Sequence, residues 1–164
     1  MRVLGIDPGT FNMGLGIVDT DGPDLLMAHM DVLKAKRTLP LAERLNVLYG
    51  GILKCIDEWK PSETAVEQPF VARNVRSAMA VGQAQAIAML AAANRGLAIS
   101  TYTPSEVKQA VTDHGGSSKE QVQEMLRVLL GLREAPASSD AADALAVAIC
   151  HINAARVRAL SILD

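Results

Sequence analysis

Short aliphatic runs separated by turn residues fill the first part of the chain. These runs, over residues 2–7, 13–19 and 25–33, predict three β-strands, and the polar segment 20–24 predicts the turn that joins the last two. Strands that follow one another through short connections usually pair side by side. We therefore expect an antiparallel meander.

Beyond residue 40 the hydrophobic period changes, and helices alternate with strands. Apolar residues recur every three or four positions over 41–59, which predicts an amphipathic helix that ends before Pro61. Gly50 and Gly51 inside it indicate a close contact with a neighbouring element. The remaining pattern predicts a strand over 64–68, a helix over 75–94 with Asn74 as its N-cap, a strand over 97–102, short helices from Pro104 and after Ser118, and a last helix from about Ser139 or Asp140 toward Leu160.

This order of elements predicts an α/β fold. Three strands followed by alternating helices and strands give a mixed five-stranded sheet whose later strands are parallel, with helices on both faces. No linker, internal repeat or change of composition divides the 164 residues. We expect one domain spanning residues 1–164.

Composition and charge narrow the class of protein. Hydrophobic residues make up 49% of the chain and aromatic residues only 3%, which predicts an aliphatic core. Cys55 and Cys150 lack CxxC spacing and are expected to be buried free thiols, which fits a reducing compartment. The first apolar run stops at Asp7 and none reaches the roughly 18 residues of a membrane span, so we expect a soluble, cytoplasmic protein without a signal peptide. A net charge of −2 argues mildly against a polyanionic partner without excluding one.

Four carboxylates occupy positions beside the expected core. Asp7 and Glu67 end predicted strands, and Asp140 and Asp143 lie about one turn apart at the start of the last helix. Functional sites in such sheets form beyond the carboxyl ends of the strands. Like charges gathered there are unfavourable unless cations neutralise them, and oxygen ligands suit Mg²⁺ or Mn²⁺. The set predicts metal-assisted phosphoryl chemistry, in which two cations activate a water and stabilise the leaving oxygen.

An ordered set of motifs covers nearly the whole chain. These are GIDPGT at 5–10, VEQPF at 66–70 followed by Asn74, GQA at 82–84, VKQ at 107–109, and DAADALA at 140–146 followed by His151. Each motif alone is weak, but together, in this order and spacing, they resemble the RuvC-type Holliday junction resolvases.

The resemblance implies a ribonuclease H-like fold and a homodimer. It implies an endonuclease that resolves four-way DNA junctions in recombination and repair, through paired, symmetric, Mg²⁺-dependent nicks in strands of like polarity. It also suggests a branch-migration helicase as a partner. The metal-binding, catalytic acids of the family correspond to Asp7, Glu67, Asp140 and Asp143, with two ions per active site, Mn²⁺ being a possible substitute.

Several further residues are candidates for contacts with DNA. Phe70 is expected to act as a wedge that stacks on junction bases, although a loop-anchoring role remains open. Lys108 and Lys119 fall at family positions that contact phosphate. Arg73, Asn74 and Arg76 complete the predicted DNA-binding set, and solvated surface charge is the ordinary alternative. The lysines and arginine at 34, 36 and 37 are interpreted as a solvated connection. His151 is interpreted as a packed histidine or one that supports the metal-binding residues, rather than as a metal ligand.

The helix over 75–94 is apolar nearly all round, so it is either buried within one domain or part of a dimer interface, which we favour.

The acids also have a purely structural explanation, in which Asp140 is a helix cap and Asp7 anchors the next turn. Two other functions stay open. One is an actin-like nucleotide-binding phosphotransferase, suggested by the DPGT turn at 7–10. The other is a branched-DNA-binding module that does not cut, which the intact acidic set disfavours.

Overall fold

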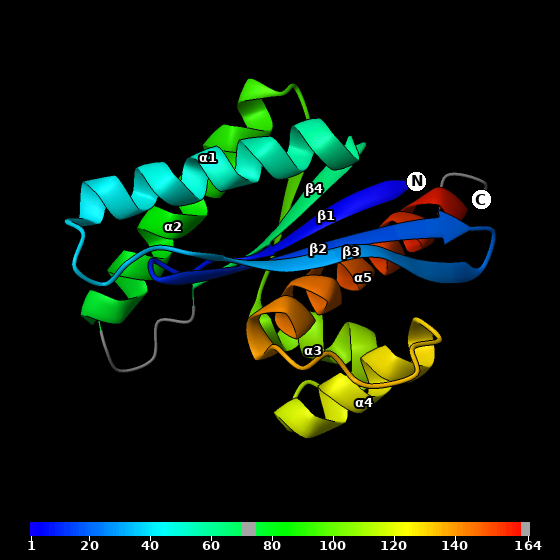
Figure 1. The fold of residues 1–164 in the computed structure, drawn as a ribbon. Coiled ribbons are helices and arrows are strands. Elements are labelled where there is room, and N and C mark those ends of the chain that lie inside the picture. The colour runs from blue at the N-terminus through cyan, green and yellow to red at the C-terminus, as the bar shows by residue number, and fades with distance from the viewer. Residues whose placement is uncertain (70–74, 162–164) are drawn as a thin grey trace.

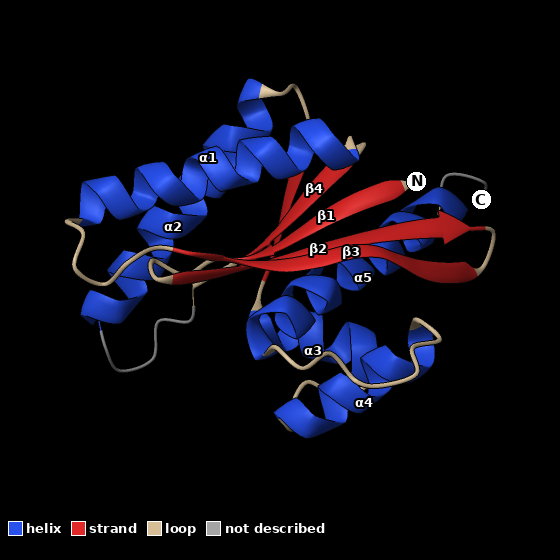
Figure 2. Cartoon of the chain, in the orientation of Figure 1, coloured by secondary structure: helices blue, strands red, loops and turns tan. Residues whose placement is uncertain are grey.

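Five strands form one mixed sheet between two layers of helices (Figures 1 and 2). The structure, a computed structural model, describes residues 1–69 and 75–161. The elements in chain order are β1 (Arg2–Asp7), β2 (Asn12–Asp21), β3 (Asp24–Lys34), α1 (Leu41–Trp59), β4 (Glu63–Glu67), α2 (Val75–Asn94), β5 (Ala98–Tyr102), α3 (Pro104–Thr112), α4 (Lys119–Leu129) and α5 (Ser139–Leu160). The predicted α/β order is confirmed.

The strand order in the sheet is β3-β2-β1-β4-β5. The first three strands are antiparallel neighbours, whereas β1, β4 and β5 run parallel to one another. In this register Ile6 lies beside Val66, and Asp7 lies opposite Gly14. The last residues of β1 and β4, Asp7 and Glu67, therefore reach the same end of the sheet.

Alternation along β1 divides the core into two parts. Leu4 and Ile6 point to the face covered by α1 and α2, whereas Val3 points to the face covered by α3, α4 and α5. All three side chains are fully buried, and each such burial stabilises the fold by about 1.5–3 kcal/mol. The prediction of helices on both faces is confirmed.

Three glycines allow α5 to lie unusually close to the sheet. A Cβ atom at Gly5, Gly14 or Gly16 would collide with the main chain of α5, at Ala144, Asp140 and Leu145 respectively. Because no side chain stands between strand and helix, α5 rests directly on β1 and β2. The first turn of α5 is thereby held against the end of β1.

Local signals set most helix ends where the sequence predicts them. Thr103 and Ser118 form complete capping boxes with Glu106 and Gln121 at the starts of α3 and α4. The cap of α5 is Ser138, whose side chain accepts a hydrogen bond from the amide of Ala141. Asp140 is therefore not the N-cap, and its carboxylate is not engaged as one.

Gly50 and Gly51 differ from each other. A Cβ at Gly51 would press against the side chain of Leu33, so this glycine does mark a close contact between α1 and β3. A Cβ at Gly50 would meet nothing within 4 Å. The expectation of close packing is wrong for Gly50, because that residue faces solvent.

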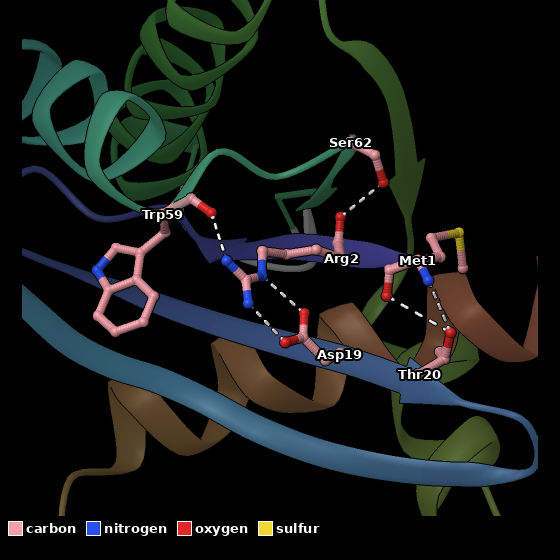
Figure 3. A network of polar contacts seen from close by, with 6 residues as sticks. All are labelled: Met1, Arg2, Asp19, Thr20, Trp59 and Ser62. Carbon is pink, nitrogen blue, oxygen red and sulfur yellow. Dashed lines mark hydrogen bonds and ion pairs between the residues drawn. The ribbon is translucent and has the colours of Figure 1, made fainter.

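A polar network closes the end of the sheet opposite to Asp7 (Figure 3). The guanidinium of Arg2 donates two hydrogen bonds of 2.7 Å to Asp19 and one of 2.8 Å to the carbonyl of Trp59. Ser62 in turn donates to the carbonyl of Arg2 at 2.9 Å. These contacts join β1, β2 and the end of α1. They lie at the end of the sheet away from Asp7 and Glu67.

The two thiols behave as predicted. Cys55 and Cys150 are free and buried, and burial raises the pKa of each to about 12. Within residues 1–69 and 75–161, none of the helices combines the length and the apolar character needed to cross a membrane.

Candidate functional site

Two carboxyl groups meet where adjacent parallel strands end. Asp7 closes β1 and Glu67 closes β4, one residue beyond the pair formed by Ile6 and Val66. Both groups are largely removed from water, and a hydrogen bond joins them that favours a higher pKa at Asp7 and a lower pKa at Glu67. Burial and mutual repulsion raise the pKa of both groups above the ordinary carboxyl range.

Asp140 and Asp143 reach the same place from the first turns of α5. The carbonyl of Asp140 lies against Gly14, which is paired with Asp7, so the start of α5 is fixed beside the end of β1. The charges of Asp143 and Asp140 both act on Asp7. The fold therefore brings together all four carboxylates that the sequence singled out.

Burial and the repulsion between these carboxylates raise the pKa values of three of them. Burial first, and then the charges of Glu67, Asp143 and Asp140 in that order, raise the pKa of Asp7 to about 8. Burial and the charge of Asp143 raise the pKa of Glu67 to about 7. Burial also raises the pKa of Asp143, against the opposing charge of Lys119. A set of acids that resists ionisation in this way gains most from a bound cation.

Two lysines face the acids across a small pocket of about 210 Å³. Lys108 of α3 and Lys119 of α4 line it together with Glu67 and Asp143. The ammonium group of Lys119 lies 3.7 Å from a carboxylate oxygen of Asp143, and its side chain is 67% exposed. An exposed pair of this kind adds little stability. The lysines are placed to meet an anion that enters the pocket.

The chemistry of the donors fits a hard divalent cation. All four are carboxylates, and three of them have raised pKa values that a cation would lower. In the described part of the chain, no three Asp, Glu, His or Cys side chains are grouped closely enough to hold an ion by themselves. Magnesium usually binds one or two carboxylates together with waters and substrate phosphate, so it does not need such a group.

The other predicted DNA contacts are only partly described. Arg76 is exposed in the first turn of α2. Phe70, Arg73 and Asn74 lie outside the described residues. Their predicted roles remain predictions that rest on the sequence.

Sequence reasoning missed Gln85, and it singled out His151 without naming the residues that His151 contacts. Gln85 of α2 donates a hydrogen bond of 3.4 Å to the main-chain carbonyl of Glu67. His151 of α5 is buried, as predicted for a packed histidine, and bonds both the hydroxyl of Tyr102 and the carboxylate of Glu63 at 2.8 Å. It thereby ties α5 to β4 and β5. The sequence signal for Gln85 was its position directly after the GQA motif. No signal marked Glu63 as a partner of His151.

Comparison with known proteins identifies the family. The model of the family described as Crossover junction endodeoxyribonuclease RuvC matches residues 3–151. The chain belongs to the RuvC family. Curated relatives named Crossover junction endodeoxyribonuclease RuvC from Dehalococcoides mccartyi and Chloroflexus aggregans are each 48% identical to it over 92% of this chain, covering 90% and 92% of their own lengths.

Solved structures support the same assignment. RuvC of Thermus thermophilus, alone and in complex with a Holliday junction substrate, superposes with TM-scores of 0.88 and 0.90 at 38% identity, over 96% of both chains. The yeast mitochondrial resolvase Ydc2 matches with a TM-score of 0.66 at 14% identity, over 91% of this chain and 76% of its own. That distant likeness supports the fold alone, and the predicted ribonuclease H-like fold is confirmed.

Proposed function

We propose that this RuvC family member is a structure-specific endonuclease that resolves four-way DNA junctions, by nicking two strands of like polarity in a symmetric, paired manner. Membership of a family of crossover junction endodeoxyribonucleases supports the reaction class. The observation that carries the proposal for this chain is the meeting of Asp7, Glu67, Asp140 and Asp143 at one end of the sheet. Four acids beside two lysines suit the hydrolysis of a phosphodiester.

The nuclease is dependent on a divalent metal, as its family is, and we propose two Mg²⁺ ions per site, with Mn²⁺ as a substitute. Asp7, Glu67, Asp140 and Asp143 would hold the ions, and Asp7 would contribute most because the charges of the other three acids all act on it. When bound, the ions supply activation of a water and stabilisation of the leaving 3′ oxygen. The raised pKa values of Asp7 and Glu67 support this assignment, because they mark carboxylates that need a counter-charge.

The lysines and arginine around the acids would position the DNA. Lys108 and Lys119 are proposed to contact phosphate groups that flank the scissile bond, since they share a pocket with Glu67 and Asp143. Arg76 is proposed to contact the backbone from the start of α2. Phe70, Arg73 and Asn74 are proposed to contact the junction on the strength of the sequence motif. Phosphate contacts fix the register of the DNA, while acids carry the chemistry.

A junction with two equivalent crossing strands calls for two equivalent sites, so we propose a homodimer of single-domain subunits spanning residues 1–164. One face of α2 supports this proposal. Val75, Met79 and Leu90 are 66%, 63% and 54% exposed, an unusual density of apolar side chains on one helix. A branch-migration helicase is proposed as a further partner on the basis of the family alone.

Cleavage of a synthetic four-way junction tests the function. Purified protein is incubated with the junction in Mg²⁺, in Mn²⁺ and in EDTA, with a linear duplex of the same sequence as the control substrate. We expect paired nicks in two strands of like polarity, in the presence of either metal and only in the junction. Binding without cleavage in both metals would identify a non-cutting module instead, and turnover of ATP would point to a phosphotransferase.

A further inference from the structure

Two arginines are stacked on a single aromatic ring near the end of β1. The guanidinium carbons of Arg37 and Arg44 lie 4.6 Å and 4.2 Å from the centre of the Phe11 ring. Phe11 belongs to the turn that follows Asp7, Arg37 to the connection between β3 and α1, and Arg44 to the first turn of α1. We call these two side chains the Phe11 arginines.

The main chain holds this arrangement in place. The amide of Ala35 donates a hydrogen bond of 2.8 Å to the carbonyl of Phe11, and Asn12 pairs with Lys34 in the sheet. The connection into α1 is thus fastened to the turn that follows Asp7. Figure 1 shows both segments at the same end of the sheet. The Phe11 arginines are therefore fixed near the acids, on the side of the sheet that α1 covers.

The guanidinium groups of Arg37 and Arg44 are not neutralised by carboxylates of the described residues, unlike three other arginines. Ion pairs join Arg2, Arg95 and Arg127 to nearby carboxylates. In the described residues, neither Arg37 nor Arg44 forms an ion pair with a carboxylate or a side-chain hydrogen bond, and the Nε atom of Arg44 is buried without a partner. The terminal nitrogens of both guanidinium groups therefore have no competing hydrogen-bond acceptor among the described residues and remain available to a ligand.

Physical chemistry favours an anion as that ligand. Two guanidinium groups beside one ring repel each other, and anions bound to them reduce that repulsion. Stacking on the ring orients their planar forks in advance, which lowers the entropy lost on binding. Phosphate is the anion that such forks match in geometry and charge.

We propose that Arg37 and Arg44 bind phosphate groups of the DNA backbone. This inference rests on the proposed function and adds a contact that it did not include. Lys108 and Lys119 meet the DNA on the side of α3, α4 and α5, whereas the Phe11 arginines meet it on the side of α1. The bound strand is then held on both sides of Asp7, which fixes the position of the scissile phosphate along its length.

The dependence of junction affinity on salt tests the proposal. The variants are Arg37→Gln and Arg44→Gln, and the matched control is Arg95→Gln, which removes the same charge from an arginine already paired with Asp57. Removal of one cation that neutralises a phosphate of duplex DNA should flatten the slope of log affinity against log salt by about 0.9. We expect that change in both variants and an unchanged slope in the control.

A second pair of variants separates charge from orientation. Phe11→Leu keeps both charges but removes the stacking surface, so the slope should stay while junction affinity falls about two- to fivefold. Arg44→Lys should also retain the slope, because the charge is kept. Thermal melts identify any variant that fails to fold, and Arg37, which is exposed, then carries the test alone.

The outcomes distinguish this inference from the function on which it rests. Slopes and affinities of Arg37→Gln and Arg44→Gln that match those of Arg95→Gln would overturn the phosphate contact, even if the protein cuts junctions. A wild-type protein that binds the junction without cutting it would overturn the endonuclease and still allow the slopes to be compared. A protein that binds no junction would overturn both.

Discussion

The carbonyl oxygen of Asp140 lies directly against Gly14, the residue that faces Asp7 across β1 and β2. No side chain fits between them, so the separation of strand and helix is set by main-chain contact alone. This main-chain contact sets how far Asp140 and Asp143, at the start of α5, lie from Asp7, at the end of β1. A side chain at position 14 would change that spacing before it changed any charge.

We expect Gly14→Ala to impair both folding and cleavage. The added methyl group would meet the Asp140 carbonyl and the Ala144 side chain, and overpacking of this kind costs about 1–3 kcal/mol. Displacing α5 should slow junction nicking by about tenfold or more, since small misplacements are costly in catalysis. Denaturant unfolding and nicking rates measure the two effects. Gly50→Ala is the control, because a methyl group there meets nothing within 4 Å; it should leave nicking unchanged and raise stability by about 0.5–1 kcal/mol, since alanine favours the helix.

Asp7→Asn should bind junctions but fail to cut them. The amide keeps the shape of the side chain and removes the charge proposed to hold the ions. We expect nicking to fall by at least about a hundredfold, the order observed when one group that stabilises a transition state is removed. Gel-shift affinity and single-turnover nicking are compared with Asp57→Asn, a surface acid paired with Arg95. Near-normal nicking by Asp7→Asn would refute its assigned role.

The raised pKa values of Asp7 and Glu67 predict how the stability of the fold varies with pH. Asp7 and Glu67 have pKa values of about 8 and about 7 in the folded chain, against about 3.9 and 4.3 when unfolded. The folded state therefore binds more protons, so metal-free stability should fall as pH rises from about 4 to 8. A cation that favours the ionised forms reverses this trend. Melting temperatures in EDTA should drop between pH 6 and pH 8.5, and Mg²⁺ should raise them more at the higher pH. Equal effects of Mg²⁺ at both values would contradict the assignment.

Met79→Glu should weaken the proposed dimer. Met79 is 63% exposed on α2, whereas Ala84 of the same helix is fully buried within its own chain. A charge at Ala84 would disrupt the core itself, so position 79 gives the cleaner test. Light scattering over a range of concentrations should show a shift toward monomer. Val157→Glu, at an exposed position of α5, is the control, and equal behaviour of the two variants would place the interface elsewhere.

Elements could be predicted from the sequence because their signals are local. The caps at Thr103 and Ser118 and the apolar runs of β1 and β4 depend only on neighbouring residues, and the structure has them within one residue of the predicted positions. The four acids could be predicted because strand ends in such sheets converge. For helix α2 the sequence could not decide between burial within one domain and a dimer interface. One side of the helix is buried in its own chain, whereas other apolar residues on it are exposed; the buried residues are Ala84, Ala88, Ala91 and Ala92.

Contacts between distant segments were beyond the sequence. The approach of α5 to Gly5, Gly14 and Gly16 depends on the main-chain separation of three elements, and a glycine in a strand has several possible causes. Arg37 was interpreted as part of a solvated connection, yet it shares the Phe11 ring with Arg44. Nothing in the local pattern links residues 11, 37 and 44, because only the pairing of β2 with β3 brings them together.

The position of α5 at the end of the chain also affects when the site can form during synthesis. Synthesis proceeds at about 5–20 residues per second and delivers α5 after every strand and every other helix of the sheet. Until α5 emerges from the ribosome, the glycine-lined face of β1 and β2 is uncovered, and the growing chain holds only Asp7 and Glu67 of the four acids. The proposed four-acid site is therefore incomplete in a nascent chain, and the docking of α5 completes the core and that site in one event.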